Sequence, residues 1–429
     1  MNQIDYNSAE YKRSRVSYMA QSTFEYFIAL LVSDVFLAKL LTSLGLSDAL
    51  VGIVSSFISI AFIIQLASIP LVRTKMSTKK LVIIFDTLSQ LFYMFMYFVP
   101  FLPIGATEKK LLVVVLILLA YIFKYLIISI CFKWANSYVA PTKRATYSAI
   151  KEMISLVSGI AFTMIMGYII DRYESLGNLN GGFLFIAISM LVINICNFVC
   201  LLMIKKESKE EHDADNKPWG DVLKNTVGNR NFRSIVIFTM VFQFAIYFSV
   251  GFLGVFKTKD LALSVFAVQV INMISNGCRV LISIPFGRFS DKYSFAKGFE
   301  LALAICFVGY ICLMFTTAQT WFLIVAYSIL YNVSVAGTNQ NSYNIVYSYV
   351  QRDYITQAMA IKNCIGGAAG FVASLLGGKL LSYIQGNGNM LFGIPVLGQQ
   401  VLAVISAVFL IVSLLIMHFV IGKQKIKIQ

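Results

Sequence analysis

The stretch KLLVVVLILLAYIFKYLIISICFK, residues 110–133, decides the fold class. It is long enough to cross the hydrocarbon core of a bilayer as a helix, and it lacks the alternation of apolar and polar residues that is typical of a barrel strand. Only helices and closed barrels satisfy all their backbone groups in lipid. The stretch therefore predicts a transmembrane helix, and Lys124 near its middle is a charge that needs a reason to be there.

Similar runs fill most of the remaining chain. Of its 429 residues, 58% are hydrophobic and only 13% are charged, which is too few charges to cover a soluble domain. The sequence predicts an all-α integral membrane protein with twelve transmembrane helices. We expect these spans near residues 20–43, 50–72, 80–102, 110–133, 146–170, 183–204, 232–255, 263–286, 297–315, 320–342, 357–383 and 397–421.

Lysine and arginine residues indicate how these spans are oriented. Most of them fall in alternate loops, and the loops of the opposite side hold only Lys109, Lys110, Arg172, Lys257 and Lys259. The positive-inside rule then predicts a cell-membrane protein with both termini in the cytoplasm. Because the basic residues are scattered among loops, the net charge of +15 indicates membrane topology, and the expected partner is the lipid bilayer, not nucleic acid.

A polar segment and an internal repeat divide the chain in two. Residues 205–231 form a long polar linker between a six-helix bundle at 1–204 and another at 232–429. Six residues of span 5 match six of span 11 in register: Ala149, Ile150, Lys151, Ile154, Gly159 and Gly167 correspond to Ala360, Ile361, Lys362, Ile365, Gly370 and Gly378. Many transporters build a central site from duplicated halves of this kind.

The segment Gly287-Arg288-Phe289-Ser290-Asp291-Lys292, after span 8, resembles the G-x-x-x-D-[RK] motif of the major facilitator superfamily. The span count, central linker and repeat resemble the same family. The copy expected after span 2 is degenerate, with Val72 and Met76 in place of glycine and aspartate, and span 5 lacks the Gly-Pro pair of drug:proton antiporters. The resemblance implies the major facilitator fold, with two six-helix bundles related by a pseudo-two-fold axis.

The resemblance also implies an inner gate. Asp291, flanked by Gly287, Arg288 and Lys292, would contact the N-terminal end of a helix in the other half, where an acid is favourable. An ordinary loop charge is the alternative. The repeat-equivalent Lys151 and Lys362 would share a role at this gate, or else extend their ammonium groups to the cytoplasm.

Polar residues follow one face of two spans. Span 8 carries Gln269, Asn272, Asn276, Arg279 and Ser283 at helical spacing, either along the translocation path or in hydrogen bonds between helices. Span 10 carries Ser328, Asn332, Asn339 and Ser342. The resemblance implies that spans 1, 4, 7 and 10 line the cavity, which favours the residues of span 10 and adds Gln243 and Tyr247 of span 7.

Four ionisable residues lie well inside expected spans, namely Asp34, Asp86, Lys124 and Arg279. By resemblance, Asp34 and Lys124 lie beside the cavity, where they could form a structural pair, bind a charged substrate or pass a proton. Asp34 is the preferred coupling residue and Glu152 the next candidate. Asp86 and Glu300 are expected to hold Arg73 and Arg288.

The residues for other chemistries are missing from the sequence. The only histidines are His212, in the polar linker, and His418, near the chain end; the seven cysteines show no metal spacing, and no phosphate-binding loop is present, so we expect no cofactor, no metal and no enzyme activity. The prediction is a monomeric secondary active transporter of a small polar or zwitterionic organic molecule, with H+ as the coupling ion and an open direction. A non-transporting receptor or accessory subunit of the same fold is the alternative.

Overall fold

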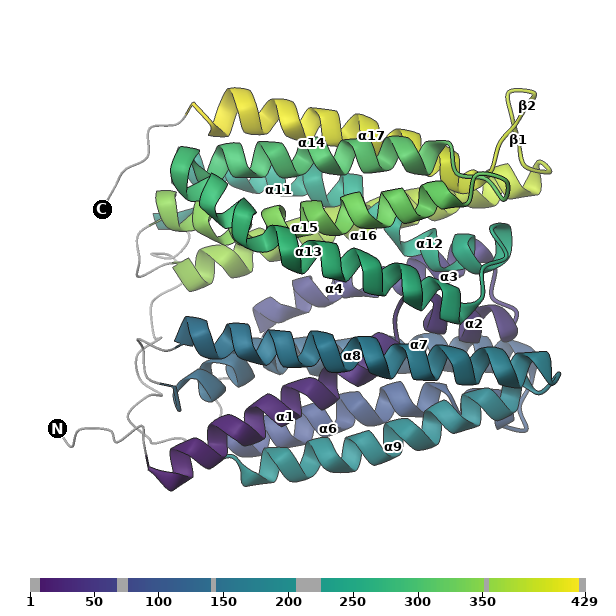
Figure 1. Cartoon of the computed structure of the whole chain (residues 1–429), viewed down its shortest axis with the longest axis horizontal. Helices are drawn as coiled ribbons and strands as arrows, with labels where there is room; N and C mark the ends of the chain where they lie inside the picture. Colours follow the sequence, from purple (N-terminus) through teal and green to yellow (C-terminus); the bar gives the residue numbers. More distant parts are fainter. Residues whose placement is uncertain (1–7, 68–75, 140–143, 206–224, 351–354, 424–429) are drawn as a thin grey trace. The chain divides into compact units, whose positions relative to one another are not determined.

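The computed structural model describes residues 8–67, 76–139, 144–205, 225–350 and 355–423, and nearly all of them are helical (Figure 1). The only strands in these ranges form one short hairpin, in which β1 (Met390–Leu391) pairs antiparallel with β2 (Ile394–Pro395). The predicted linker lies mostly outside the described residues. The all-helical architecture agrees with the sequence.

Nine helices of the described chain are long and apolar enough to cross a membrane, and they correspond to the expected spans 4–12. The first three expected spans differ for local reasons. Span 1 is interrupted near Ser33. Span 2 is a shorter apolar segment, Asp48–Ile64, and the rest of this expected span lies mostly outside the described residues. Span 3 carries the charged residues Lys79, Lys80 and Asp86. Composition alone therefore underestimates the spans that carry charge or breaks.

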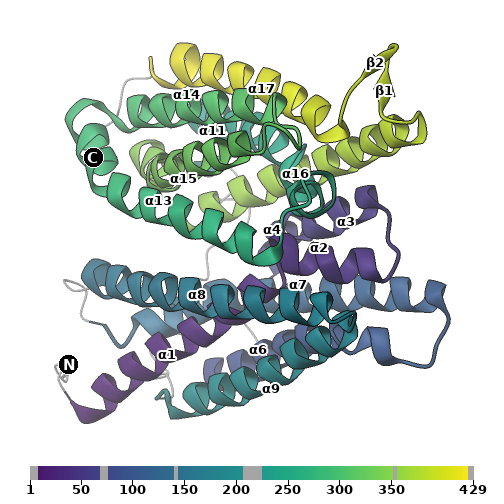
Figure 2. The ribbon, with the colours of Figure 1, turned by 45° about the vertical axis from the view of Figure 1, so that its right-hand side comes forward.

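The helices group into two compact units. Unit 1 comprises residues 1–46, 64–215 and 264–269. In both views its long helices lie side by side, with α1 against α8 and α9 and with α6 against α7 and α9 (Figures 1 and 2). Its elements are α1 (Ala9–Leu31), α2 (Asp34–Ser43), η1 (Gln65–Ala67), α6 (Thr78–Met96), η2 (Val99–Phe101), α7 (Ala106–Asn136), α8 (Arg144–Ser175) and α9 (Leu179–Met203).

Unit 2 comprises residues 47–63, 216–263 and 270–429. Within it, α14 packs on α15 and α17, and α11 packs on α16 and α17 (Figure 2). Its elements are α3 (Asp48–Ser55), α4 (Phe57–Ile64), α11 (Arg230–Tyr247), η5 (Val250–Phe252), α12 (Leu253–Val255), η6 (Phe256–Asp260), α13 (Val265–Tyr293), α14 (Phe295–Met314), α15 (Phe322–Tyr349), α16 (Ile355–Gly386), the β1–β2 hairpin, α17 (Gly398–Ile416) and η8 (Met417–Ile421).

The first expected span is two helices with a break at Ser33 and Asp34. Asp34 has a left-handed φ of 46°, and the Ser33 hydroxyl donates to the Leu30 carbonyl across the break. Aspartate tolerates this conformation better than most residues, and a carboxylate is favourable in the first turn of α2. The sequence offers no proline or glycine here, so the break was not foreseen.

The glycines matched in the repeat occupy equivalent packing positions. Gly159 of α8 lies against Tyr26 of α1, and its repeat partner Gly370 of α16 lies against Tyr247 of α11. Farther along the same helices, Gly167 meets the backbone of residue 266 at the start of α13, and Gly378 meets residues 49 and 53 of α3. The repeat read from the sequence is therefore also a repeat of helix contacts.

Two glycines allow the end of α13 to pack closely within unit 2. A Cβ on Gly337 of α15 would lie 2.4 Å from the Phe286 ring, and one on Gly298 of α14 would lie 2.1 Å from the Ser290 hydroxyl. Phe286 and Ser290 are both buried. The family-like motif thus lies on the last turns of α13, not in a loop, and is anchored through its buried face.

We expect Gly337→Ala to lower the thermal stability of the purified protein, because overpacking of this kind costs about 1–3 kcal/mol. The matched control is Gly277→Ala on α13, where an added Cβ meets nothing within 4 Å. That variant should unfold at the same temperature as the wild type or slightly above it, since alanine favours helix. Equal melting temperatures for the two variants in detergent would contradict the packing argument.

Candidate transport and coupling site

Three charged side chains meet inside unit 1, each from a different helix. The Lys124 ammonium of α7 lies 2.6 Å from Glu25 Oε2 of α1 and 2.8 Å from Asp86 Oδ1 of α6. Their side chains are 12%, 28% and 2% exposed, respectively. Burial makes an isolated charge costly, so such groups are paired. Two carboxylates against one ammonium leave this cluster with one negative charge too many when all three are ionised.

Neutral side chains complete the cluster. Asn197 of α9 donates to Asp86 Oδ2 at 2.7 Å, and Gln21, one turn before Glu25 on α1, donates to Glu25 Oε2 at 2.9 Å. Nearby, the Ser89 hydroxyl donates to the Ala120 carbonyl at 2.8 Å and holds α6 against α7. Asp86 therefore has a partner on each oxygen, whereas both of the bonds that we assign to Glu25 fall on Oε2.

This arrangement corrects the expected pairing of Lys124. Its ion pairs are with Glu25 and Asp86, so the alternative of a structural pair with Asp34 is not what this structure shows. Asp86 pairs with Lys124, whereas its expected partner Arg73 lies outside the described residues. Glu25 was missed because span 1 was placed from residue 20, which put Glu25 near its end. Since α1 begins at Ala9, Glu25 lies more than four turns inside the helix.

The other charges of the first span have local roles. Asp34 begins α2 after the helix break, so helix geometry already accounts for part of its placement. Lys39 pairs with Glu174 near the end of α8. Glu300, expected to hold Arg288, contacts the His418 ring at 3.3 Å. The coupling role anticipated for Asp34 stays a prediction.

The polar stripe of span 8 lies on one continuous helix, α13. Gln269 is buried and Asn272, Asn276, Arg279 and Ser283 are half-buried, whereas five apolar residues from Ile274 onward are exposed, namely Ile274, Val280, Leu281, Ile282 and Ile284. The Ser283 hydroxyl donates to the Arg279 carbonyl at 2.7 Å. The exposed apolar face suits lipid, and the polar face is turned toward the protein.

The polar residues of span 10 divide between different environments. Asn332 donates to the Ser328 carbonyl of its own helix at 3.0 Å, and Asn339 is exposed. Spacing in the sequence did not single out Asn341, which is fully buried and donates to the Ser290 hydroxyl at 3.1 Å.

On span 7, a Cβ on Gly366 would lie 3.2 Å from the Gln243 side chain, which places Gln243 against α16.

The repeat-equivalent lysines differ in their surroundings. Lys362 is buried and donates to the Ser342 hydroxyl at 2.7 Å, so its ammonium does not extend to solvent. Lys151 is half-buried, 5.1 Å above the Tyr18 ring, and Glu152 beside it is exposed. The snorkelling alternative is therefore wrong for Lys362. A gate role for either lysine stays a prediction.

The motif residues on α13 divide into a buried and an exposed face. Arg288, Asp291 and Lys292 are exposed and Gly287 is half-buried, whereas Ser290 is buried and bonded to Asn341. The sequence expected Asp291 to contact a helix N-terminus. A contact of this kind occurs at another place: Asp171 of α8 accepts the backbone N–H groups of Val265 and Phe266, at 3.0 and 2.8 Å, at the start of α13.

The chain was compared with known families and structures. The model described as Major Facilitator Superfamily matches residues 16–276 and 235–427. The chain belongs to the Major Facilitator Superfamily. No curated protein sequence matches it.

Solved structures of this superfamily's transporters resemble the chain over nearly its whole length. A mutant of the nucleoside transporter NupG has a TM-score of 0.74 at 13% identity, covering 94% of this chain and 99% of that one. The D-xylose-proton symporter has a TM-score of 0.69 at 13% identity, covering 94% and 97%. A bacterial homologue of the human lysosomal transporter Spinster has 0.67 at 14%, covering 97% of each.

Membership of the Major Facilitator Superfamily confirms the family resemblance, the fold class and the expectation of a multi-pass membrane transporter, not an enzyme. At these low identities the solved structures support the fold alone. The roles of individual residues must therefore come from the contacts of this chain. Of these contacts, the Glu25–Lys124–Asp86 cluster is the most unusual for a membrane interior.

We expect Lys124→Met to destabilise the protein strongly, because removing one partner of a buried ion pair costs about 3–5 kcal/mol. Adding Asp86→Asn should restore part of the loss, since it removes the buried charge that Lys124 compensates. Lys39→Met, which breaks a pair with the exposed Glu174, should have little effect. Asp86→Asn alone completes the cycle. Thermal unfolding of the two single variants and the double variant in detergent measures the coupling between Lys124 and Asp86, and purely additive losses would contradict it.

Proposed function

We propose that this chain is a secondary active transporter that moves a small polar or zwitterionic organic molecule by alternating access, with H+ as the coupling ion. It works as a monomer in the cell membrane, with both termini in the cytoplasm. Uptake and efflux screens in a deletion strain, with and without an uncoupler, identify the substrate and the direction. Binding without flux in proteoliposomes would support the receptor alternative.

The observation that carries the proposal is the Glu25–Lys124–Asp86 cluster. Its surplus negative charge can be neutralised by one proton, which makes the cluster a natural site for H+. Asp86 is held on both oxygens and is almost fully buried, so it serves as a fixed counter-charge for Lys124. Glu25 is the more exposed carboxylate of the two, and we therefore assign the exchangeable proton to Glu25.

The coupling follows from competition for the Lys124 ammonium. When Glu25 is ionised, Lys124 is shared between two carboxylates; when Glu25 is protonated, the ammonium is attracted mainly to Asp86. A small shift of α1 relative to α6 and α7 would then accompany protonation. One solved relative of the fold is a proton symporter, which is compatible with this coupling ion.

The organic substrate would be recognised by amide and guanidinium groups of unit 2. Asn272, Asn276 and Arg279 present hydrogen-bond donors and one positive charge along one face of α13, with Asn332 on α15. Such a set suits a molecule with hydroxyl or carboxylate groups. Glu25 and Lys124 supply charges of both signs in unit 1, which suits a zwitterion.

Glu25→Gln should abolish accumulation of the substrate against its gradient and preserve counterflow, because the glutamine cannot exchange a proton but keeps the shape of the side chain. Asp34→Asn and Glu152→Gln are the matched variants for the other two candidate carboxylates, and both should retain uphill transport. Proteoliposomes with an imposed pH gradient measure uphill uptake and counterflow in the same preparation.

The outcomes separate the candidates. If Asp34→Asn loses uphill transport and Glu25→Gln keeps it, the coupling carboxylate is Asp34, as the sequence had suggested. If all three variants concentrate substrate at the wild-type, uncoupler-sensitive rate, none of these carboxylates carries the proton. Expression and melting temperature are recorded for each variant so that a folding defect is not mistaken for loss of coupling.

A second prediction concerns Asp291, which we propose as a gate residue. Asp291→Asn should slow transport severalfold and leave substrate binding largely unchanged, because an exposed acid at the end of α13 acts on access, not on the substrate. Ligand binding and transport rates of the same purified variant test this. Loss of binding with normal alternation of access would refute the gate assignment.

A further inference from the structure

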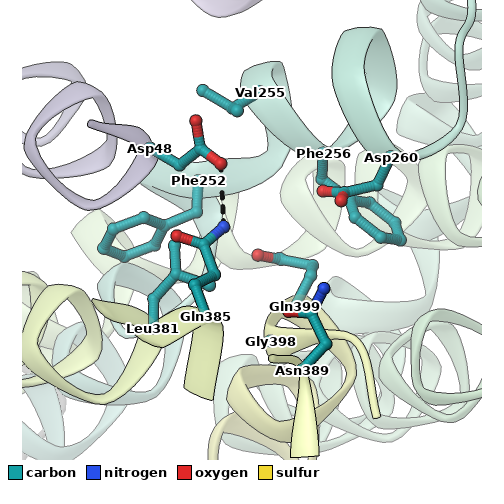
Figure 3. Close-up of a pocket in the computed structure, with 10 residues that line it drawn as sticks. All are labelled: Asp48, Phe252, Val255, Phe256, Asp260, Leu381, Gln385, Asn389, Gly398 and Gln399. Atoms are coloured by element: carbon teal, nitrogen blue, oxygen red, sulfur yellow. Dashed lines mark hydrogen bonds between the residues drawn. The ribbon is translucent and has the colours of Figure 1, made fainter. Parts of the chain in front are cut away.

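A small cavity lies in unit 2 where α11 gives way to η5, α12 and η6. Its volume is about 10 Å³, which is close to the minimum for one water molecule or one small ion. Figure 3 shows Asp48 of α3 on one side and Asp260 of η6 on the other, with Gln385, Asn389 and Gln399 between them. The polar atoms around it are mostly oxygens.

Asp48 is held in place but keeps a free acceptor position. Both of its oxygens lie 2.9 Å from the Lys259 ammonium, and Oδ2 also accepts the Gln385 amide N–H at 2.8 Å. A carboxylate has about four lone-pair sites, so one site on Oδ1 is left. Asp48 is buried, whereas Lys259 is largely exposed and reaches it from the solvent side.

A second and independent feature is an unpaired acceptor. Gln399 is 3% exposed, and its amide N–H donates to the Ser249 carbonyl at 3.2 Å. Among the described residues, its Oε1 atom has no hydrogen-bond partner. Figure 3 shows this side chain extending into the space toward Gln385. A buried oxygen without a donor is costly, so it indicates that something positive or hydrogen-bonding belongs there.

The charges around the cavity do not balance. The Asp260 carboxylate lines the same cavity as Asp48 and lies across it from Asp48 (Figure 3). Two carboxylates line the cavity, and one lysine, Lys259, pairs with Asp48. Lys257, which is buried nearby in the sequence, is engaged in an interaction of its own. A single positive charge would therefore neutralise the site, and the cavity has room for one small particle.

We propose that this cavity binds one small monovalent cation, Na+, through Asp48 Oδ1, the Asp260 carboxylate and Gln399 Oε1. Oxygen ligands exclude the metals that prefer sulfur and nitrogen. Ca²⁺ takes six to eight oxygens and Mg²⁺ retains several waters, and the cavity has room for neither arrangement. It is likewise too small for the organic substrate. The site is separate from the Glu25–Lys124–Asp86 cluster and does not depend on that cluster being the coupling site.

The bound ion would hold α3 against η6 and α17, because its ligands come from all three elements. The full-length protein in detergent tests this through its melting temperature, with NaCl exchanged for choline chloride at constant ionic strength. Na+ should raise the melting temperature in a saturable manner, since an ion that binds only the folded state stabilises it. Li+ should act similarly, whereas the larger K+ should act weakly.

Two variants locate the site. Asp260→Asn and Gln399→Leu should each require about tenfold or more Na+ for the same stabilisation, because each removes one ligand to a charge. Gln400→Leu is the matched control: it is the same substitution one residue away, where the amide bonds the Leu397 and Thr316 backbones outside the cavity. It should keep the wild-type Na+ dependence even if it lowers the starting stability.

The wild type alone can overturn the proposal, whatever the variants do. A melting temperature that is the same in Na+ and choline at pH 8 means that the cavity holds only water. Stabilisation by acid without any effect of Na+ means that a proton shared by the two carboxylates balances the charge. Equal responses to Na+, K+ and choline are an ionic-strength effect. Direct ²²Na+ binding to the purified protein that Gln399→Leu does not weaken places the ion elsewhere.

Discussion

One ammonium group connects four helices of unit 1. Lys124 of α7 is bonded to α1 through Glu25 and to α6 through Asp86, and Asp86 is bonded in turn to Asn197 of α9. Hydrocarbon offers no partner to a charge, so each of these groups is restricted to positions where the others can reach it. The relative depth of the four helices is therefore determined by this cluster more closely than by apolar packing, which is tolerant of sliding.

Close packing at glycines determines how the helices of the repeat contact one another, as the charged cluster does for the helices of unit 1. Helices in lipid gain little from burying apolar side chains, so association depends on close contact and on hydrogen bonds. Gly159 and Gly370 each lie against a tyrosine ring from another helix, whereas Gly167 lies against the beginning of α13 and Gly378 lies against residues 49 and 53 of α3. These contacts give a packing reason for the two glycine pairs of the repeat. A side chain at any of them would push two helices apart.

Much of the fold could be predicted from the sequence, because the length and hydropathy of a span depend on the bilayer alone. This holds for the nine apolar spans. The repeat and the family motif could be predicted for another reason: they are patterns of residue identity in the sequence itself, and the family match agrees with them. The partners of Lys124 could not be predicted in this way. Glu25 lies on a helix whose first turns are polar, so hydropathy placed the membrane boundary too close to it. Asn341 was hidden for a different reason: it is adjacent to Ser342 on a helix, and spacing alone does not tell which of two neighbours is buried.

The break at Asp34 shows that a charge which the sequence does single out can also be difficult to interpret. An intramembrane carboxylate is a strong sequence signal, and for Asp34 it predicts either a coupling residue or a structural pair with Lys124. The structure gives it a backbone reason, a left-handed residue at the start of α2. A sequence states that a charge is present in a span but not whether the backbone or another side chain requires it. Glu25 and Asp34 are nine residues apart in the first expected span. Glu25 pairs with Lys124, and Asp34 begins α2 with a left-handed backbone.

The two halves have kept their helix contacts and have diverged in their polar chemistry. The charged cluster that we assign to the proton lies in unit 1, whereas unit 2 presents amides and one guanidinium along α13 and α15. The repeat-equivalent lysines follow this division: Lys362 is buried on a serine, and Lys151 lies over a tyrosine ring. A duplicated fold needs equivalent packing for its halves to move in a similar way, but it needs different side chains if one half is to bind an ion and the other an organic molecule. The matched glycines and the unmatched polar groups are therefore both what we expect of the proposed mechanism, in which the halves would share their motion and divide recognition between them.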